Sequence, residues 1–339
     1  MKWGNVKWIL ILLLVVADAY LGIQLIRQYR GAYTVDRTAV ENAAELLSDA
    51  GLLLDPSVIP EAVEREYVYR IPVSSAGFEA ALAGIAGSPV TGTYLQPSSS
   101  GVSLVFENGD SAEYFQNLYF TYTRRGKEET EEEENARLAE TAKRFLDGAD
   151  GFSPVGGAKA REAEKAAAAV LDAMTGAGGA GVSGVRLQPR TGRVCRTEDG
   201  SLFLIVFREE LSRAGSRGGT VIGGTQVCAL VENGIVRYLE GTWVPFLPDE
   251  VYGTGKLDQL NILFSEMRRK EGSVSAGAPQ RITEMERVSY MLWETGTVLW
   301  LRPAWQITYA EENGDSRFVT LCDAVTGGVV SEIQSSGQR

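Results

Sequence analysis

Residues 227–239 read VCALVENGIVRYL, in which Asn233-Gly234 separates two apolar runs. Asn and Gly accept the positive φ angles of a two-residue hairpin loop, and the flanking residues favour strands. A second such pattern lies at 102–123, where Asn108-Gly109 separates a first apolar run from an alternating run rich in Tyr and Phe. Both stretches predict antiparallel hairpins.

Further strands and helices are expected on both sides of these hairpins. The strand-like runs are 66–72, 92–96, 112–123, 185–189, 193–197, 202–209, 281–293, 303–309 and 318–323. Helical spacing or alanine content predicts helices at 35–54, 128–147, 158–174 and 256–270. Runs of strands with separate helices are typical of an α+β fold, so we expect antiparallel sheets packed with helices.

The order of elements repeats in outline, which predicts two related modules. Residues 31–175 would form the first module and 185–339 the second, with 176–184 as a flexible linker rich in glycine and alanine. Residues 1–30 would form an N-terminal tail and a membrane anchor. The glycine-rich stretch 218–224 does not open a helix, so we expect a mobile loop there rather than a phosphate site.

The anchor is the apolar stretch 6–26, VKWILILLLVVADAYLGIQLI. As a helix it would be about 31 Å long, which matches a hydrocarbon core of ~30 Å. A cleaved signal peptide is the alternative, because Ala17-Asp18-Ala19 has the form of a cleavage site. The apolar run continues through Ile26 and so favours an uncleaved span. The flanking basic residues are balanced, so they do not decide the orientation.

One face of this helix is expected to contact a partner. Its members are Ile11, Leu14, Asp18, Gly22 and Leu25. Asp18 near the middle of the span costs ~2.5–3.5 kcal/mol on insertion scales, and a polar group beside a glycine suits close helix packing. Alternatively, Asp18 is protonated, its side chain reaches toward the membrane surface, or the span is shifted along the sequence.

Composition excludes several classes of function. The chain has a formal net charge of -11, which disfavours nucleic-acid binding, and it contains no histidine. Ser-His-Asp catalysis, Cys-His catalysis and His-ligated zinc are therefore excluded. The three cysteines are far apart; Cys195 and Cys228 either pair across strands or remain buried free thiols, like Cys322, and the free state is favoured.

We find no residue pattern that predicts a catalytic, cofactor-binding or metal site. The glutamate-rich run 128–134 is interpreted as a solvated helix start, with a cation site as the less favoured alternative. Four acids, Asp110, Glu113, Glu240 and Asp249, are conceivable as a hydrolytic carboxylate pair, but sequence does not give their separation.

Two stretches resemble a known family. Residues 2–7, KWGNVK, followed by an apolar span with Asp18-Ala19-Tyr20-Leu21, resemble the opening of YycI proteins. Residues 301–307, LRPAWQI, and 323–329, DAVTGGV, resemble PepSY-type modules and the C-terminal part of the YycH/YycI group. Here Pro303 is expected to start a strand, Trp305 and Ile307 to share one face, and residues 326–328 to form a turn.

The resemblance implies a non-enzymatic regulator of a membrane sensor histidine kinase that governs cell-wall metabolism in Gram-positive bacteria. It also implies a cytoplasmic N-terminus, an extracytoplasmic C-terminal domain and a YycH-like partner beside the kinase and the bilayer. The small-residue stretches 158–184 and 213–224 look like additions to the family pattern, which leaves the partner's identity open. An extracellular PepSY-type inhibitor or chaperone, or a carboxylate-dependent cell-wall hydrolase, is the alternative.

Overall fold

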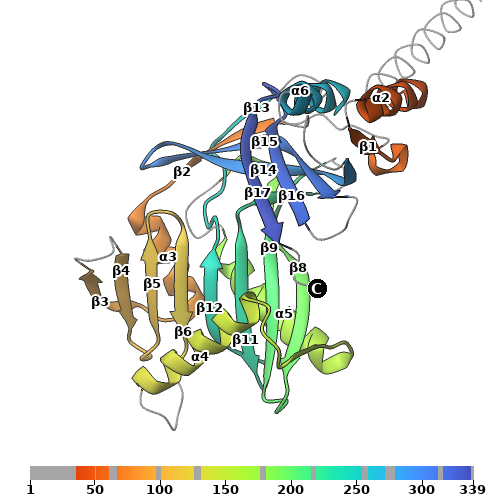
Figure 1. The fold of residues 1–339 in the computed structure, drawn as a ribbon. Coiled ribbons are helices and arrows are strands. Elements are labelled where there is room, and N and C mark those ends of the chain that lie inside the picture. The colour runs from red at the N-terminus through yellow and green to blue at the C-terminus, as the bar shows by residue number, and fades with distance from the viewer. Residues whose placement is uncertain are drawn as a thin grey trace, which may run out of the picture. The chain divides into compact units, whose positions relative to one another are not determined.

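The computed structural model describes residues 36–49, 51–60, 67–96, 101–125, 131–175, 181–214, 219–253, 259–271, 279–311 and 316–336 (Figure 1). The expected anchor at 6–26, with Ile11, Leu14, Asp18, Gly22 and Leu25, lies outside these residues. Within the described part, no helix is long and apolar enough to cross a membrane.

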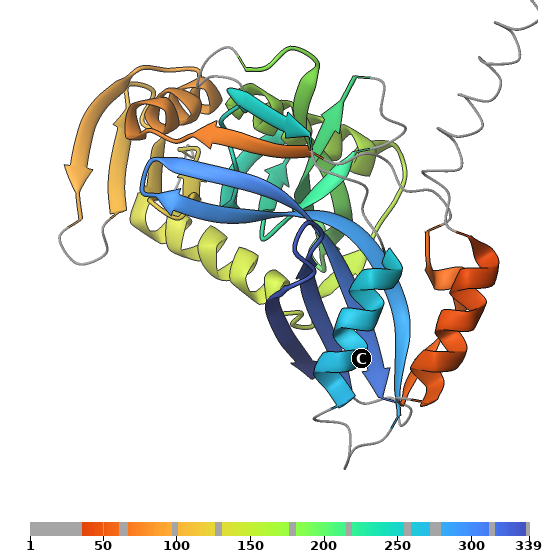
Figure 2. The ribbon, with the colours of Figure 1, turned by 90° about the horizontal axis from the view of Figure 1, so that it is seen from above.

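Contacts divide the chain into two units. Unit 1 comprises Met1–Glu66, Gly253–Glu286 and Ala304–Arg339, and unit 2 comprises Tyr67–Tyr252 and Arg287–Pro303. The expected modules, 31–175 and 185–339, are consecutive segments, whereas each observed unit is assembled from separated ones. Strands β14 (Gln280–Thr295) and β15 (Val298–Glu311) form a long hairpin with a part in each unit (Figure 2).

The expected α+β fold with antiparallel sheets in two related modules is wrong. Among the described residues, 49% lie in strands and 28% in helices, and all 17 strands belong to one hydrogen-bonded network. Two pairings in it are parallel, β1 with β14 and β10 with β14. The pairing of β6 with β12 joins strands that the sequence placed in different modules.

Unit 2 is built around a large antiparallel sheet. Its strands follow one another in the order β3 (Val90–Leu95), β4 (Gly101–Phe106), β5 (Ser111–Phe115), β6 (Tyr119–Thr123), β12 (Ile235–Thr242), β11 (Gln226–Glu232), β9 (Leu202–Arg213), β8 (Val185–Thr197) and β7 (Phe152–Pro154).

A second set of strands continues from β9. Strand β10 (Thr220–Gly223) pairs with β9 and with β14, so part of the expected mobile loop is a strand. Strand β15 pairs with β2 (Tyr67–Pro72), which also pairs with β13 (Glu250–Gly253). Tyr69, Ile71, Leu299 and Leu301 of these strands join the main core of unit 2.

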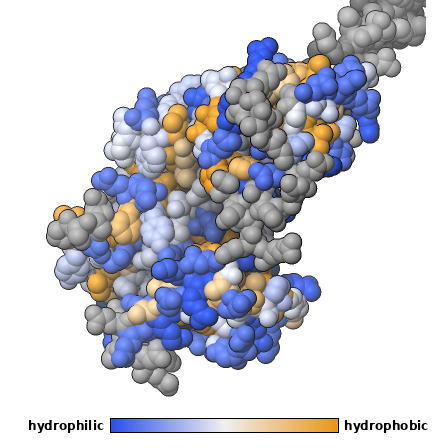
Figure 3. Space-filling model, in the orientation of Figure 1, coloured by the Kyte–Doolittle hydropathy of each residue, from blue (hydrophilic) through white to orange (hydrophobic). Residues whose placement is uncertain are grey.

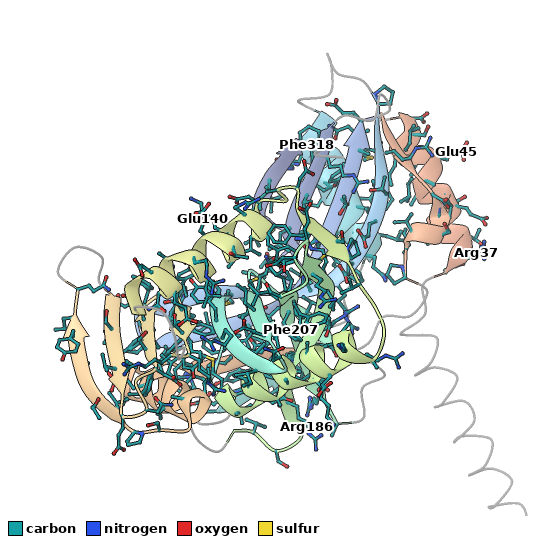
Figure 4. The ribbon with its side chains drawn as sticks, turned by 90° about the horizontal axis from the view of Figure 1, so that it is seen from below. Arg37, Glu45, Glu140, Arg186, Phe207 and Phe318 are labelled. Atoms are coloured by element: carbon teal, nitrogen blue, oxygen red, sulfur yellow. The ribbon has the colours of Figure 1, made fainter. Side chains whose placement is uncertain are left out.

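Helices cover both faces of the large sheet. On one face α3 (Ser75–Ala86) and α5 (Ala158–Met174) enclose the main core, in which Phe207 lies among densely packed side chains (Figure 4). The sequence did not predict α3, whereas α5 has the expected bounds. On the other face α4 (Glu131–Leu146) packs Leu138, Ala142 and Phe145 against a smaller core.

The turns between strands show which turns could be predicted from local sequence and which could not. Asn233 and Gly234 have φ angles of 51° and 78°, so the predicted hairpin between β11 and β12 is confirmed. The single strand expected over 112–123 is wrong, because Gln116, Asn117 and Leu118 form a turn between β5 and β6. Leu118 adopts a φ of 66° while its side chain is buried in the main core.

Unit 1 contains the other described elements. Strand β1 (Leu52–Leu54) pairs with β14, β15 pairs with β16 (Ser316–Asp323), and β16 pairs with β17 (Val329–Ser336). A one-turn helix, η1 (Pro56–Val58), follows β1. Helices α2 (Arg37–Asp49) and α6 (Gln259–Glu271) supply Val40, Leu47, Ile262 and Leu263 to its core.

Pro303 lies within β15 and does not start it. Residues 298–301 of this strand pair with β2, and residues 304–310 pair with β16. Pro303 therefore lies between the residues of β15 that pair with β2 and those that pair with β16, a position at which a residue without an N–H interrupts neither of these two ladders. Trp305 and Ile307 are buried in the core of unit 1, as expected.

Cys195, Cys228 and Cys322 are free and buried. Strand β9 lies between β8, which carries Cys195, and β11, which carries Cys228, so these two cysteines are not on neighbouring strands. The favoured expectation of buried free thiols is confirmed.

Candidate functional site

The candidate site is a row of polar side chains across four neighbouring strands of unit 2. Ser103 on β4 lies opposite Glu113 on β5, Glu113 opposite Thr121 on β6, and Thr121 opposite Glu240 on β12. Residues directly opposite each other in a sheet project from the same face. We call Ser103, Glu113, Thr121 and Glu240 the polar row; all four are half-buried.

Glu113 is held by two neighbours. Gln96 Nε2 donates to Glu113 Oε1 at 2.6 Å and to Ser103 Oγ at 2.8 Å. Ser103 Oγ in turn donates to Glu113 Oε1 at 3.1 Å. The carboxylate therefore has a fixed orientation, and both of these bonds end on the same oxygen, Oε1.

Glu240 is held by two tyrosines. The Tyr119 hydroxyl donates to Oε1, and the Tyr238 hydroxyl donates to Oε2 at 3.2 Å. Burial, together with the charge and the hydrogen-bond acceptance of Glu240, raises the pKa of both tyrosines. Both hydroxyls therefore stay protonated across the physiological range and act as permanent donors to this carboxylate.

The polar row lies on the same side of the sheet as α4. Helix α4 covers the part of this face that carries Cys195, Leu204, Leu230 and Tyr238. In Figure 3, which looks onto this side, hydrophilic and intermediate residues cover much of unit 2, with hydrophobic residues scattered among them.

An adjacent row extends the face toward β8. Tyr119 lies opposite Thr242, Thr242 opposite Gln226, and Arg208 on β9 opposite Arg190 on β8. The Phe115 and Tyr119 rings lie 5.8 Å apart at the other end. The face thus carries carboxylates and aromatic rings on one side and guanidinium groups on the other.

A shallow depression of about 320 Å³ borders the same region. It is lined by Gln116, Asn117, Trp293, Glu294, Thr295 and Gly296. These residues belong to the turn between β5 and β6 and to the tip of the β14–β15 hairpin. Trp300 Nε1 donates to Glu294 Oε2 at 2.7 Å, which fixes one wall.

The structure separates the four acids that the sequence suggested as pairs. Asp110 is buried in the turn after β4, and Asp249 pairs with Arg70 at 2.8 Å. Glu113 and Glu240 do share a face, but β6 lies between their strands. Two strand spacings separate their Cα atoms by about 9.6 Å.

A hydrolytic pair requires a defined distance between its two carboxyl groups, not between its Cα atoms. The two carboxyls of retaining glycosidases lie ~5–5.5 Å apart and those of inverting ones ~6.5–9.5 Å apart. Each carboxylate here is also held by two donors of its own chain. Among the residues that the structure describes, no group of three or more Cys, Asp or Glu side chains could hold a metal ion.

The first turn of α4 contains a glutamate that forms an ion pair with the sheet. Glu134, inside the expected glutamate-rich run, is buried and paired with Arg237 of β12. The expected solvated helix start therefore does not include Glu134. Residues 126–130 lie outside the described part of the chain.

The C-terminal motif has a structural role in unit 1. Asp323 Oδ1 accepts the backbone N–H groups of Val325 and Thr326 at 2.8 and 2.7 Å and the Thr326 hydroxyl at 3.1 Å. Gly327 follows with a φ of 71°. The expected turn at 326–328 is confirmed, and its Asp and Thr serve to close the loop between β16 and β17.

Sequence reasoning missed the residues that hold the two carboxylates, namely Gln96, Ser103, Tyr119 and Tyr238. A local signal existed for Tyr119, which lies in the alternating run 112–123. The register that brings Tyr119 to Glu240 joins positions more than a hundred residues apart, which no local pattern encodes.

No protein-family model matches the chain, and no curated protein matches it. An uncharacterized protein from Eubacterium rectale ATCC 33656 has a similar structure, with a TM-score of 0.45 and 11% identity over 86% of this chain and 98% of that one. The Bacillus megaterium YpeB C-terminal domain matches with a TM-score of 0.29 and 9% identity over 78% of this chain and 99% of that one. At these TM-scores neither structure supports an inference about function.

Proposed function

We propose that this chain is a non-catalytic regulatory protein that binds its partner through the polar row of unit 2. The partner is a membrane sensor histidine kinase of cell-wall homeostasis, and a YycH-like protein joins the assembly. The stretch 6–26 holds the chain in the cell membrane, with the N-terminus cytoplasmic and the remainder extracytoplasmic. Residues 2–7, 18–21 and 301–307 support the kinase and the location through their family resemblance.

The observation that carries the binding role is the fixed geometry of Glu113 and Glu240. Each carboxylate is oriented by two donors from its own chain, at half-buried positions of a broad sheet. Preorganised acceptors lose little conformational entropy when a partner binds. They suit an extracytoplasmic segment that presents arginine, lysine or amide donors.

The test is recovery of the kinase with the full-length chain from detergent-solubilised membranes. Glu113→Gln combined with Glu240→Gln removes both charges and keeps the side-chain shapes. A hydrogen bond to a charged group contributes about 1.5–3 kcal/mol, so recovery should fall roughly tenfold or more. Glu140→Gln on α4 is the matched control, because Glu140 is exposed and points outward (Figure 4).

A second arm tests the span. Asp18→Leu should weaken recovery of the kinase while unfolding of the remaining chain is unchanged, because it alters only the proposed helix contact. Equal recovery for native chain, Glu113→Gln/Glu240→Gln and Glu140→Gln would contradict the role of the polar row. Release of cell-wall fragments by the native chain, abolished in the same double variant, would instead assign a hydrolase.

A further inference from the structure

A long stretch without charge lies at one edge of unit 2. Residues 80–106 contain no Asp, Glu, Lys or Arg, although 23% of the whole chain is charged. This stretch includes the second half of α3 and the hairpin of β3 and β4. It is therefore an electrically neutral segment of a strongly acidic protein.

Strand β3 is the edge of the large sheet. Among the described residues it pairs only with β4, and it lies at the margin of the sheet in Figure 1. Tyr94 and Leu95 have 62% and 79% of their surface exposed, on opposite faces of the strand. The β-bulge of this pair lies at its start, between Val90 and Gly92, so residues 92–95 form a regular edge.

The opposite edge of the sheet, formed by β7 and β8, carries features that hinder pairing with another chain, and β3 differs from it in this respect. Among the residues that the structure describes, strand β7 pairs only with residues 195–197 of β8, and the first half of β8 carries Arg186, Pro189 and Arg190. A bulge follows between Thr191 and Arg193. Charge, proline and bulges are the devices by which edge strands avoid pairing with other chains. Residues 92–95 of β3 have none of them.

We propose that β3 pairs with β3 of a second copy of this chain, antiparallel about a two-fold axis. The charge distribution selects this occupant, because two chains of net charge -11 repel each other over most approaches and the neutral hairpin is where they can meet. An edge strand that pairs with itself gives an isologous interface, which closes as a dimer.

The residues of β3 fit such a pairing. An axis through Thr93 places Tyr94 of each copy opposite Gly92 of the other. Tyr94 already lies over its own Gly92, where an added Cβ would be 2.9 Å from Tyr94 Cε2. An aromatic ring opposite a strand glycine compensates for the missing side chain. The faces are preserved by this axis, so the two polar rows would belong to one continuous sheet surface.

The interface is small. Pairing of six strand residues buries much less surface than the ~800 Å² per partner of a standard interface. The dimer should therefore dissociate on dilution. Confinement in a membrane would raise its effective concentration. This inference does not depend on the proposed kinase partner.

The test is the molar mass of the full-length chain in detergent, measured by light scattering over a range of concentrations after subtraction of the detergent. The native chain should approach twice 36.7 kDa as concentration rises. Tyr94→Lys and Leu95→Lys should each shift the equilibrium to monomer at least tenfold, because each variant places two ammonium groups in a small interface whose strand residues are otherwise uncharged. Ile333→Lys, at a strand residue that is also 62% exposed, should leave it unchanged.

A cysteine at the axis gives an independent readout. Thr93→Cys should form an intermolecular disulfide under mild oxidation, whereas the native cysteines are buried. A native chain that stays monomeric at every concentration would overturn the proposal, as would a dimer that survives both lysine variants. Recovery of the monomer with a different polypeptide crosslinked to Thr93→Cys would assign the edge to a heterologous strand instead.

Discussion

Glu209 is a fully buried ionisable side chain of unit 2 with one unpaired carboxylate oxygen. It is 0% exposed, its Oε2 accepts the Val244 N–H at 2.9 Å, and its Oε1 has no hydrogen-bond partner in the structure. Its neighbours on the same face of β9 are Phe207 and Leu211. Burial raises the pKa of Glu209 well above its usual value and so favours the protonated form.

This environment predicts a pH dependence of stability. The folded pKa is raised, so the contribution of Glu209 is fully present below its unfolded pKa and is lost as pH rises through the folded pKa. Each pH unit in that window removes about 1.4 kcal/mol. Glu209→Gln should therefore become increasingly more stable than the native chain as pH rises above about 4.5. Urea unfolding of both chains across pH measures this, and identical pH slopes would contradict it.

Asp110 is buried too, but both of its carboxylate oxygens accept hydrogen bonds. Its carboxylate accepts from Tyr122 OH at 2.5 Å, Asn108 Nδ2 at 2.9 Å and Arg125 N at 3.0 Å. Asp110→Ala would leave several donors unpaired, so we expect a loss of about 3 kcal/mol in the free energy of unfolding. Tyr122→Phe removes one donor and should lose about 1 kcal/mol. Equal losses for the two variants in urea unfolding would show that the carboxylate is not the centre of this turn.

At the scale of elements, local signals predicted turns and amphipathic helices well. Asn233-Gly234 and the bounds of α5 follow from sequence alone. Helix α3 was missed because SAGFEAALAGIA is apolar on all sides and holds two glycines, so it lacks the periodicity that marks a surface helix. The turn at Leu118 was missed because leucine rarely adopts a positive φ, and its burial in the main core stabilises that conformation here.

The hairpin of β11 and β12 permits a controlled test of turn chemistry. Gly234 has a φ of 78° and Gly296 has no positive φ, and a Cβ at either would meet nothing within 4 Å. Gly234→Ala should therefore cost about 1–2 kcal/mol through backbone strain alone. Gly296→Ala should instead stabilise the fold by about 0.4–1 kcal/mol. The difference is measurable by urea unfolding, and similar values for both variants would exclude strain as the cause.

At the scale of the whole molecule, the sequence predicted strands but not their order. The pairing of β6 with β12 and the parallel pairing of β10 with β14 join distant segments, and a strand's own residues do not specify its distant partner. The sequence also gave no sign that β14 and β15 contribute to two units, although Pro303 marks the change of partner within β15. The polar row could not be predicted for the same reason. Glu113 and Glu240 lie on one face because β6 pairs with both β5 and β12, and this pairing joins distant segments.

The most direct test of the central claim is site-specific photocrosslinking from the polar row in native membranes. A crosslinking amino acid replaces Thr121, which lies between Glu113 and Glu240, and in a second chain replaces Glu140 on the outer side of α4. The proposed function predicts a crosslink from position 121 to a membrane sensor histidine kinase, identified by mass spectrometry, and none from position 140. Absence of the kinase from the products at 121, or its equal capture at both positions, would contradict binding through the polar row.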